Sequence, residues 1–243
     1  MGEESFADGE KSIDEFLEWM KGSPELPTTS QPSPGAFFEV FEELAPKGPI
    51  LCMTISEKLS GTAQSATMAK NMLPDADIEI FDTKAATSAE AAQVIRAAQL
   101  LEEGRPLAEV LEYLETYRES IRIFQGFLNL TNLVKGGRLS RWQGRIAEFM
   151  NIRVLCHNVD GAIEVLEKVR GTEQLFERIV QLVTEQGVDI EDRILVISHA
   201  DNREWATWLA KRVEALNPRD VMVIPMGSVI ATHAGPGSVV ISV

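Results

Sequence analysis

Short apolar segments alternate with helix-forming segments along this chain, and this alternation is the feature that most limits its fold. Apolar runs at Ile50–Ile55 and Ile78–Phe81 are each followed by a helical pattern, the second of them from about Ser88 to Glu103. Gly104-Arg105-Pro106 breaks that helix, and another runs on to about Glu119. Strands that alternate with helices indicate a mostly parallel sheet with crossover helices. The first part of the chain therefore predicts an α/β domain.

The pattern changes after Gly136-Gly137-Arg138. Two β-rich runs, Ile152–Val159 and Ala162–Val169, flank Asp160-Gly161, which is a strong β-hairpin signal. A helix, a strand, a second helix and C-terminal strands are expected next, at about Glu173–Gln186, Ile194–Ser198, Glu204–Leu216 and from Val221 onward. We therefore predict a second α/β domain with a mixed sheet and a β-hairpin. The predicted domains are residues 1–135 and 136–243.

Composition excludes several classes of protein. The 243 residues are 44% hydrophobic, enough for a sizeable core, and the formal net charge is −14. Such a charge argues against a nucleic-acid partner, which requires a basic surface. No stretch reaches the roughly 20 apolar residues of a membrane span, and the acidic N-terminus lacks a signal-peptide pattern. Cys52 and Cys156 lie in apolar strands and are expected to be reduced core residues. We expect a cytoplasmic protein.

Two hydroxyl-rich loops precede predicted helices. The loop Thr28–Gly35 contains Ser33, a natural N-cap, followed by Pro34, which fits the first helical position. The run Ser56–Thr62 follows the first strand directly and leads into a helix rich in small residues. The N-terminus of a helix at the carboxyl end of a strand favours anionic groups. Both loops are therefore candidates for contact with an anion.

A third polar segment lies near the C-terminus. The strand Val221–Pro225 leads to Thr232-His233-Ala234-Gly235-Pro236-Gly237, which predicts a loop that holds an imidazole beside glycines. Hydroxyls, backbone N–H groups and an imidazole are adequate donors for a carboxylate. The sequence contains no H-E-x-x-H motif, Cys/His cluster or Walker loop, so no metal and no cofactor are predicted.

Four motifs in order, TTSQPSPG, ISEKLSGTAQSA, LVKGGRLS and THAGPG, resemble the DegV family of bacterial fatty-acid-binding proteins. The resemblance covers essentially the whole chain. It implies two α/β domains with the ligand, a long-chain fatty acid, bound non-covalently in the interdomain cleft. It also implies that the carboxylate is presented to a separate ATP-dependent fatty acid kinase, and that the protein carries the acyl phosphate without catalytic turnover of its own.

The resemblance also assigns roles to residues. Thr29, Ser56 and His233 match positions that hold the carboxylate in DegV-like proteins, although Glu57 replaces the second of two consecutive serines. The rest of the predicted ligand-binding set comes from the same motifs and comprises Ser30, Ser60, Gly61, Thr62 and Gly235. Arg170, in Val169-Arg170-Gly171-Thr172, matches a position implicated in docking the kinase.

The N-terminus departs from the family pattern. In that pattern a first strand with an Asp-Ser-Thr-type loop precedes the segments found here. Phe6-Ala7-Asp8-Gly9 corresponds to a point well inside the pattern. We therefore expect the first domain to be N-terminally shortened.

The alternative hypothesis is that the protein is an enzyme. Ser60, Asp82 and His233 occur in the Ser–Asp–His order of many hydrolases, which suggests a serine hydrolase or acyl transferase that uses Ser60 and His233. The G-x-S-x-G elbow is missing, because Glu57-Lys58-Leu59-Ser60-Gly61 lacks the first glycine. The sequence therefore favours a binding protein over this alternative.

Overall fold

The computed structural model describes residues 5–23, 25–139, 152–185, 190–191 and 193–243. The backbone groups into two compact units. The larger, here called the six-strand unit, comprises Met1–Thr29, Arg122–Asn158 and Ile163–Val243. The smaller, the two-strand unit, comprises Ser30–Ile121 and Val159–Ala162, the second of which is the tip of a hairpin.

The two-strand unit contains a parallel sheet. Strands β1 (Ile50–Thr54) and β2 (Ile78–Asp82) pair in parallel, with Ile50 opposite Ile78, and α3 (Thr62–Asn71) connects them. The other elements of this unit are α2 (Pro34–Leu44), the 3-10 turn η1 (Ala45–Lys47), α4 (Ser88–Glu102) and α5 (Leu107–Ser120). This pairing confirms the parallel sheet that the strand–helix alternation predicted.

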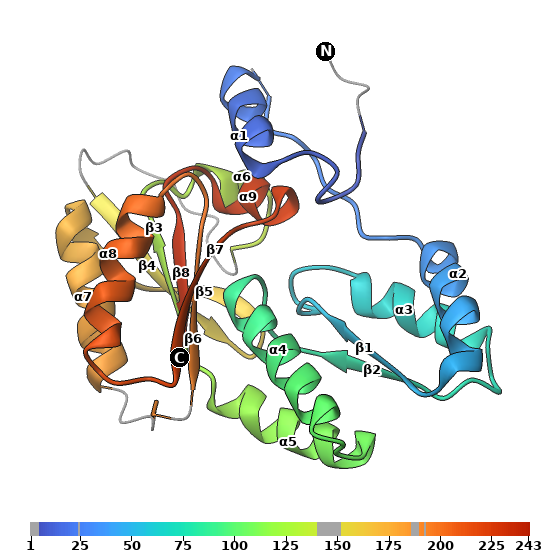
Figure 1. The fold of residues 1–243 in the computed structure, drawn as a ribbon. Helices are drawn as coiled ribbons and strands as arrows, with labels where there is room; N and C mark the ends of the chain where they lie inside the picture. The colour runs from blue at the N-terminus through green and yellow to red at the C-terminus, as the bar shows by residue number, and fades with distance from the viewer. Residues whose placement is uncertain (1–4, 24, 140–151, 186–189, 192) are drawn as a thin grey trace. The chain divides into compact units, whose positions relative to one another are not determined.

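Helices cover both faces of this small sheet, as Figure 1 shows. Ile50 and Ile78 belong to an apolar cluster with residues of α2 and α3, such as Phe41 and Ala66. Phe81 belongs to a second cluster with residues of α4 and α5. Successive strand residues thus point to opposite layers, as the two-residue period of a β-strand requires.

The six-strand unit contains a mixed sheet in the order β5-β4-β3-β8-β6-β7. Its strands are β3 (Ile123–Phe127), β4 (Ile152–Val159), β5 (Ala162–Arg170), β6 (Ile194–His199), β7 (Asp220–Pro225) and β8 (Val239–Ser242). β3 pairs antiparallel with both β4 and β8, whereas β6 pairs in parallel with β7. The mixed sheet of the second domain is therefore confirmed.

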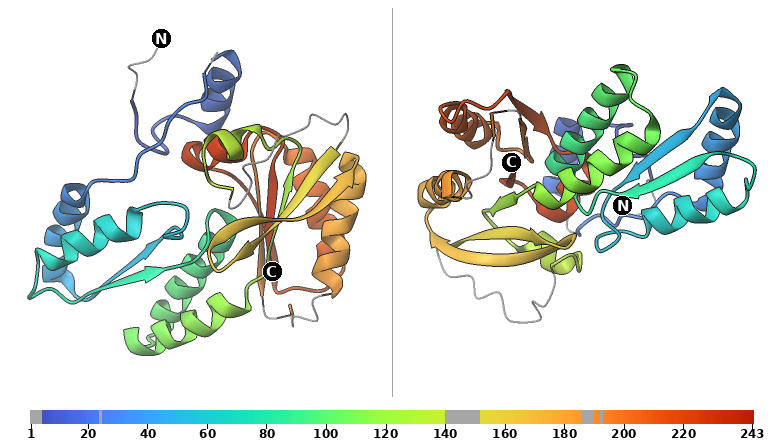
Figure 2. Two further views of the ribbon diagram at one scale, coloured as in Figure 1. Left: turned by 180° about the vertical axis from the view of Figure 1, so that it is seen from behind. Right: turned by 90° about the horizontal axis from the view of Figure 1, so that it is seen from below.

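Two long helices cover one face of this sheet. α7 (Thr172–Glu185) and α8 (Arg203–Glu214) lie side by side in Figure 1 and in the views of Figure 2. Phe176 and Leu209 are among their fully buried residues and share one apolar cluster with β-strand residues such as Ile197. Gly126 on β3 permits this close packing, because a Cβ there would lie 3.2 Å from side chains of α7.

Three further helices gather at one end of the six-stranded sheet (Figure 1). They are α1 (Ile13–Gly22), α6 (Thr131–Lys135) and α9 (Ser228–Ala234), and α9 packs against both of the others. A capping box begins α1, since the Ser12 hydroxyl accepts from the backbone N–H of Glu15 and the Glu15 carboxylate accepts from the backbone N–H of Ser12. This end of the unit carries the site described below.

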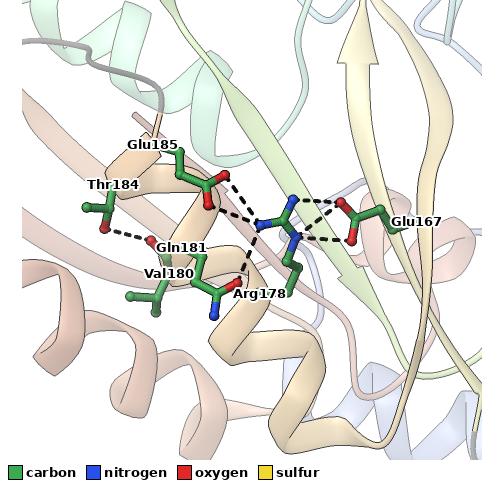
Figure 3. A network of polar contacts seen from close by, with 6 residues as sticks. All are labelled: Glu167, Arg178, Val180, Gln181, Thr184 and Glu185. Atoms are coloured by element: carbon green, nitrogen blue, oxygen red, sulfur yellow. Dashed lines mark hydrogen bonds and ion pairs between the residues drawn. The ribbon is translucent and has the colours of Figure 1, made fainter.

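The β4–β5 hairpin turns at Asp160-Gly161, as predicted, and both residues have positive φ. β5 lies at the edge of the sheet and is tied to α7 by the Arg178 guanidinium (Figure 3). Arg178 donates to Glu167 of β5 at 2.8 Å and to Glu185 of its own helix at 3.4 Å. This hydrogen bond to Arg178 lowers the pKa of the Glu167 carboxyl. The ion pair between Arg178 and Glu167 thus stabilises β5, which has a neighbouring strand on one side only.

The predicted boundary at residues 135 and 136 differs from this division. β3 and α6 lie before that boundary, yet both belong to the six-strand unit, because β3 pairs with β4 and β8. The sequence also predicted a loop around His233, which is wrong, since His233 lies in the last turn of α9. Both cysteines are free thiols; Cys52 is partly buried, whereas Cys156 is buried, which raises the pKa of its thiol to about 12.

Candidate functional site

Thr29 and His233 form a direct side-chain pair in the six-strand unit. The Oγ1 atom of Thr29 lies 2.8 Å from Nε2 of His233, although 204 positions separate the two residues. Thr29 follows α1, and His233 lies in the last turn of α9, which ends at Gly235 with a φ of 76°. Both side chains are half-buried. A hydroxyl and an imidazole predicted to act together are thus brought into contact.

α6 and Gly136, the residue that ends it, shape the space around the imidazole. Asn132 donates its side-chain N–H to the carbonyl oxygen of Thr232 at 2.8 Å, which fixes the last turn of α9. Gly136 lies against the His233 ring, since a Cβ at residue 136 would come within 3.0 Å of Cε1 and closer to Nδ1. A Cβ at Gly235 would lie 3.1 Å from Cγ of Asn132. Thr29, Asn132, Gly136, His233 and Gly235 are here called the imidazole site.

The surroundings of this imidazole favour its neutral form. Burial, and then the positive charge of Arg138, lower the pKa of His233 below its ordinary value. Its Nδ1 atom is buried and finds no hydrogen-bond partner among the described residues. A neutral imidazole carries one proton, so Nε2 either donates to the Thr29 hydroxyl or accepts from it. When Nε2 donates, the hydroxyl proton of Thr29 is free for another acceptor.

Ser56 begins the second polar segment, in the two-strand unit. Its hydroxyl is fully buried, donates to the carbonyl oxygen of Gly161 at 2.8 Å and accepts from the backbone N–H of Lys58 at 3.2 Å. A Cβ at Gly161 would collide with the Ser56 hydroxyl, so glycine is needed at the hairpin tip for this contact as well as for the turn. In this structure the hydroxyl proton of Ser56 is therefore donated to the backbone carbonyl of Gly161.

The rest of this segment surrounds the start of α3. The hydroxyls of Ser60 and Thr62 lie 2.8 Å apart, and no side chain caps this helix terminus among the residues described. The amide of Gln31 packs on Gly61, where a Cβ would lie 2.7 Å from Nε2, and donates to the buried hydroxyl of Ser65 at 2.9 Å. The uncapped N–H groups and the two hydroxyls can serve an anion.

The remaining predicted residues are exposed. Ser30 is exposed and belongs to the two-strand unit, next to Thr29 in the chain. Arg170 is exposed at the end of β5, immediately before Gly171, whose φ is 96°. Exposure suits a residue that contacts a partner protein, and the partner-binding role of Arg170 stays a prediction, as do the ligand-binding roles of the other residues.

Sequence reasoning missed Gln31, Asn132 and Gly136 as parts of these clusters. Gln31 and Gly136 lie inside the motifs TTSQPSPG and LVKGGRLS, but the motifs do not indicate which distant residues they contact. Asn132 gave no signal, because an asparagine in a short helix is common and its partner is 100 positions away. Only packing reveals such contacts.

The structure gives the enzyme alternative no support. The Ser60 hydroxyl is paired with Thr62, and His233 Nε2 is paired with Thr29. The Asp82 carboxylate accepts from the backbone N–H of Lys84 at 2.9 Å and thereby stabilises the turn after β2. Each member of the suggested triad therefore makes a contact with another residue in this structure.

The described ranges contain no cluster of three or more His, Cys, Asp or Glu side chains able to hold a metal ion. Among their helices, none combines the length and hydropathy that a membrane crossing requires.

Fold and site together define a two-unit α/β protein whose polar groups gather after strands and at helix ends. A sequence model described as "Uncharacterised protein, DegV family" matches residues 1–243. The chain is 33% identical over 229 residues to a DegV domain-containing protein of Streptococcus pneumoniae serotype 4, covering 93% of this chain and 80% of that protein. The chain belongs to the DegV family, which confirms the resemblance seen in its motifs.

Solved structures of similar proteins agree. A Thermus thermophilus DegV family protein, described by its fatty acid binding, superposes with a TM-score of 0.91 at 29% identity, covering 98% of this chain and 86% of that one. The Streptococcus pneumoniae Fatty Acid Kinase (Fak) B3 protein, loaded with linoleic acid, gives a TM-score of 0.85 at 26% identity, covering 96% and 84%. The named ligands of these neighbours are fatty acids.

Proposed function

We propose that this protein binds a long-chain fatty acid without a covalent bond and presents its carboxylate to a separate ATP-dependent fatty acid kinase. It would then carry the acyl phosphate product, in the cytoplasm, where ATP is available. The observation that carries the proposal is the contact between the Thr29 hydroxyl and the His233 imidazole in a DegV-family fold. The protein itself would have no catalytic turnover.

The energetics of a fatty acid require both an apolar environment and a polar end. Burial of about 14 methylenes contributes on the order of 10 kcal/mol gross, at roughly 0.8 kcal/mol each. A carboxylate buried without donors would cancel much of that. Thr29 and His233 together supply a donor, because the Nε2–H tautomer of the imidazole donates to the Thr29 hydroxyl oxygen and leaves the hydroxyl proton for the carboxylate.

Similar proteins support the proposal. The Thermus thermophilus neighbour is described as binding fatty acid, and the Streptococcus pneumoniae neighbour is named as a fatty acid kinase component and carries linoleic acid. The kinase step rests on the second of these alone. The binding step rests also on the geometry of the imidazole site.

Organic extraction and mass spectrometry test the binding step. Purified protein should release about one acyl chain per molecule, and lipid-free protein should bind added oleate or palmitate. The variant His233→Ala should lose much of this affinity while keeping its fold. Protein that carries no lipid and refuses both fatty acids would end the proposal.

Two further assays separate the kinase step from the enzyme alternative. Acyl phosphate should form only when ATP and a cognate fatty acid kinase are both added to the loaded protein. Incubation with activated acyl esters should release no more than background product, and Ser60→Ala should not change that rate. Multiple turnovers that vanish in Ser60→Ala would instead identify a hydrolase or acyl transferase.

A further inference from the structure

Asp8 contacts the helix that carries His233. Its Oδ1 atom accepts hydrogen bonds from the backbone N–H of Ser228 at 2.7 Å, from the Ser228 hydroxyl at 2.5 Å and from the backbone N–H of Val229 at 3.4 Å. Ser228 is the first residue of α9. A carboxylate far away in the sequence thus satisfies the free N–H groups at the start of this helix.

α9 needs an outside cap because its own N-cap residue is Gly227, which has no side chain to donate or accept. A side chain at residue 227 would also displace Asp8, since a Cβ there would lie 2.7 Å from Oδ2 and 3.1 Å from Oδ1. The glycine therefore leaves room for the carboxylate. The negative charge is favourable at a helix N-terminus.

The segment that bears Asp8 is itself held in a turn. The backbone N–H of Glu10 donates to the carbonyl oxygen of Ala7, the Glu10 carboxylate accepts from the N–H of Ala7, and Gly9 has a φ of 85°. Phe6 packs edge-on against Phe16 of α1. The carboxylate is thus presented by a fixed piece of backbone.

α9 is only seven residues long, so a displacement of its first turn also displaces its last turn. Asp8 fixes the first turn, and Asn132 fixes the last turn through the carbonyl oxygen of Thr232. His233 lies between these restraints and the Gly136 backbone. We infer that Asp8 is a positioning residue for His233: by capping α9 it sets where the imidazole meets Thr29 and an incoming carboxylate.

The effect of Asp8 on ligand binding rests on the proposed function. The effect of Asp8 on the position of the His233 imidazole does not. NMR titration of the lipid-free protein tests the effect on the imidazole directly. The chain has only three histidines, so the His233 signal can be assigned with His233→Gln. In Asp8→Ala, the His233 pKa should move from its lowered value toward the ordinary one, while the signals of His157 and His199 stay in place. A general loss of stability would not change the titration of one histidine alone.

Three variants sharpen the test. Asp8→Asn keeps an acceptor oxygen for Ser228 and should restore the wild-type titration. Gly227→Ala, at a residue with a φ of −66°, keeps Asp8 but pushes its carboxylate away, and should behave like Asp8→Ala. Asp75→Ala, which removes an exposed carboxylate from the two-strand unit, is the charge-matched control and should change nothing.

Fatty-acid affinity gives the second readout. Asp8→Ala should bind about fivefold more weakly, the size of a lost helix cap, and should cause no further loss in the His233→Gln background. An unchanged His233 titration in both Asp8→Ala and Gly227→Ala overturns the inference, whether or not the protein binds lipid. Absence of lipid binding in the wild type, with the titration shifted as expected, would overturn only the proposed function.

Discussion

Replacement of Gly136 by alanine should impair ligand binding without harming the fold. Gly136 has φ −74° and ψ −10°, which alanine adopts freely, so the backbone accepts the substitution. The new methyl group, however, would lie 3.0 Å from Cε1 of His233, 3.0 Å from the carbonyl oxygen of Asn132 and closer still to Nδ1. Since ordinary van der Waals contact begins at 3.4 Å, the imidazole has to move.

The size of the effect follows from the geometry. A ring shift of about 1 Å would stretch the 2.8 Å separation between Thr29 Oγ1 and His233 Nε2 beyond hydrogen-bond range. A hydrogen bond to a charged acceptor contributes about 1.5–3 kcal/mol, and the carboxylate would lose a correctly placed donor. The expected loss is therefore roughly 10- to 150-fold in the Kd for a fatty acid.

Gly137→Ala is the matched control. Gly137 has a φ of 70°, which strains alanine, but a Cβ there meets nothing within 4 Å. This variant should lose about 1–2 kcal/mol of stability and keep its affinity, because the imidazole is untouched. Fluorescent fatty-acid displacement and thermal unfolding, measured on both variants, separate the two effects.

The reasoning would be refuted by a Gly136→Ala protein with wild-type affinity. A Gly137→Ala protein with weakened binding and unchanged melting temperature would be equally damaging, since it would show that the whole turn, and not contact with the imidazole, controls the site.

Three other substitutions follow from the structure. Thr29→Val should weaken fatty-acid binding by about 1–3 kcal/mol in a displacement assay, whereas Thr28→Val, at the exposed neighbouring position, should leave it unchanged. Burial raises the pKa of Glu90 to about 7. The contribution of Glu90 to the free energy of unfolding is therefore complete below its ordinary pKa of 4.5 and is lost as the pH rises through about 7. Glu90→Gln should therefore be more stable than wild type at pH 8, by about 1–3 kcal/mol in denaturant unfolding, and equal to it near pH 4.5; an equal difference at both pH values would exclude this cause. Arg170→Ala should keep wild-type lipid affinity while slowing phosphorylation by the kinase, and an unchanged rate would assign Arg170 to the solvated surface.

Local features of the fold were predictable because each depends on neighbours in the sequence. The capping box at Ser12 and Glu15 and the N-cap at Ser33 rest on contacts three residues apart, and both are present. The turn at Asp160-Gly161 requires positive φ at both residues, which the residue types themselves favour. The order of four motifs was sufficient to indicate the DegV family.

The helical position of His233 was not predictable in this way. The segment Ser228–Ala234 is short and ends beside glycines, so its propensity favours a loop. Asp8 and Asn132 satisfy the two ends of α9 from elsewhere in the chain, and these long-range hydrogen bonds make the helix favourable. Tertiary contacts thus overrode local propensity.

The sequence by itself determined most of the element types, several caps and turns and the residue chemistry available for an anion, since these depend on short-range periodicity and side-chain type. Only the tertiary structure decided that β3 joins the six-stranded sheet and that Thr29 meets His233 across 204 positions. It also decided that Gly136 gives the imidazole its space. Such contacts depend on how whole strands and helices pack, and burial of their apolar faces selects that packing without leaving a local pattern.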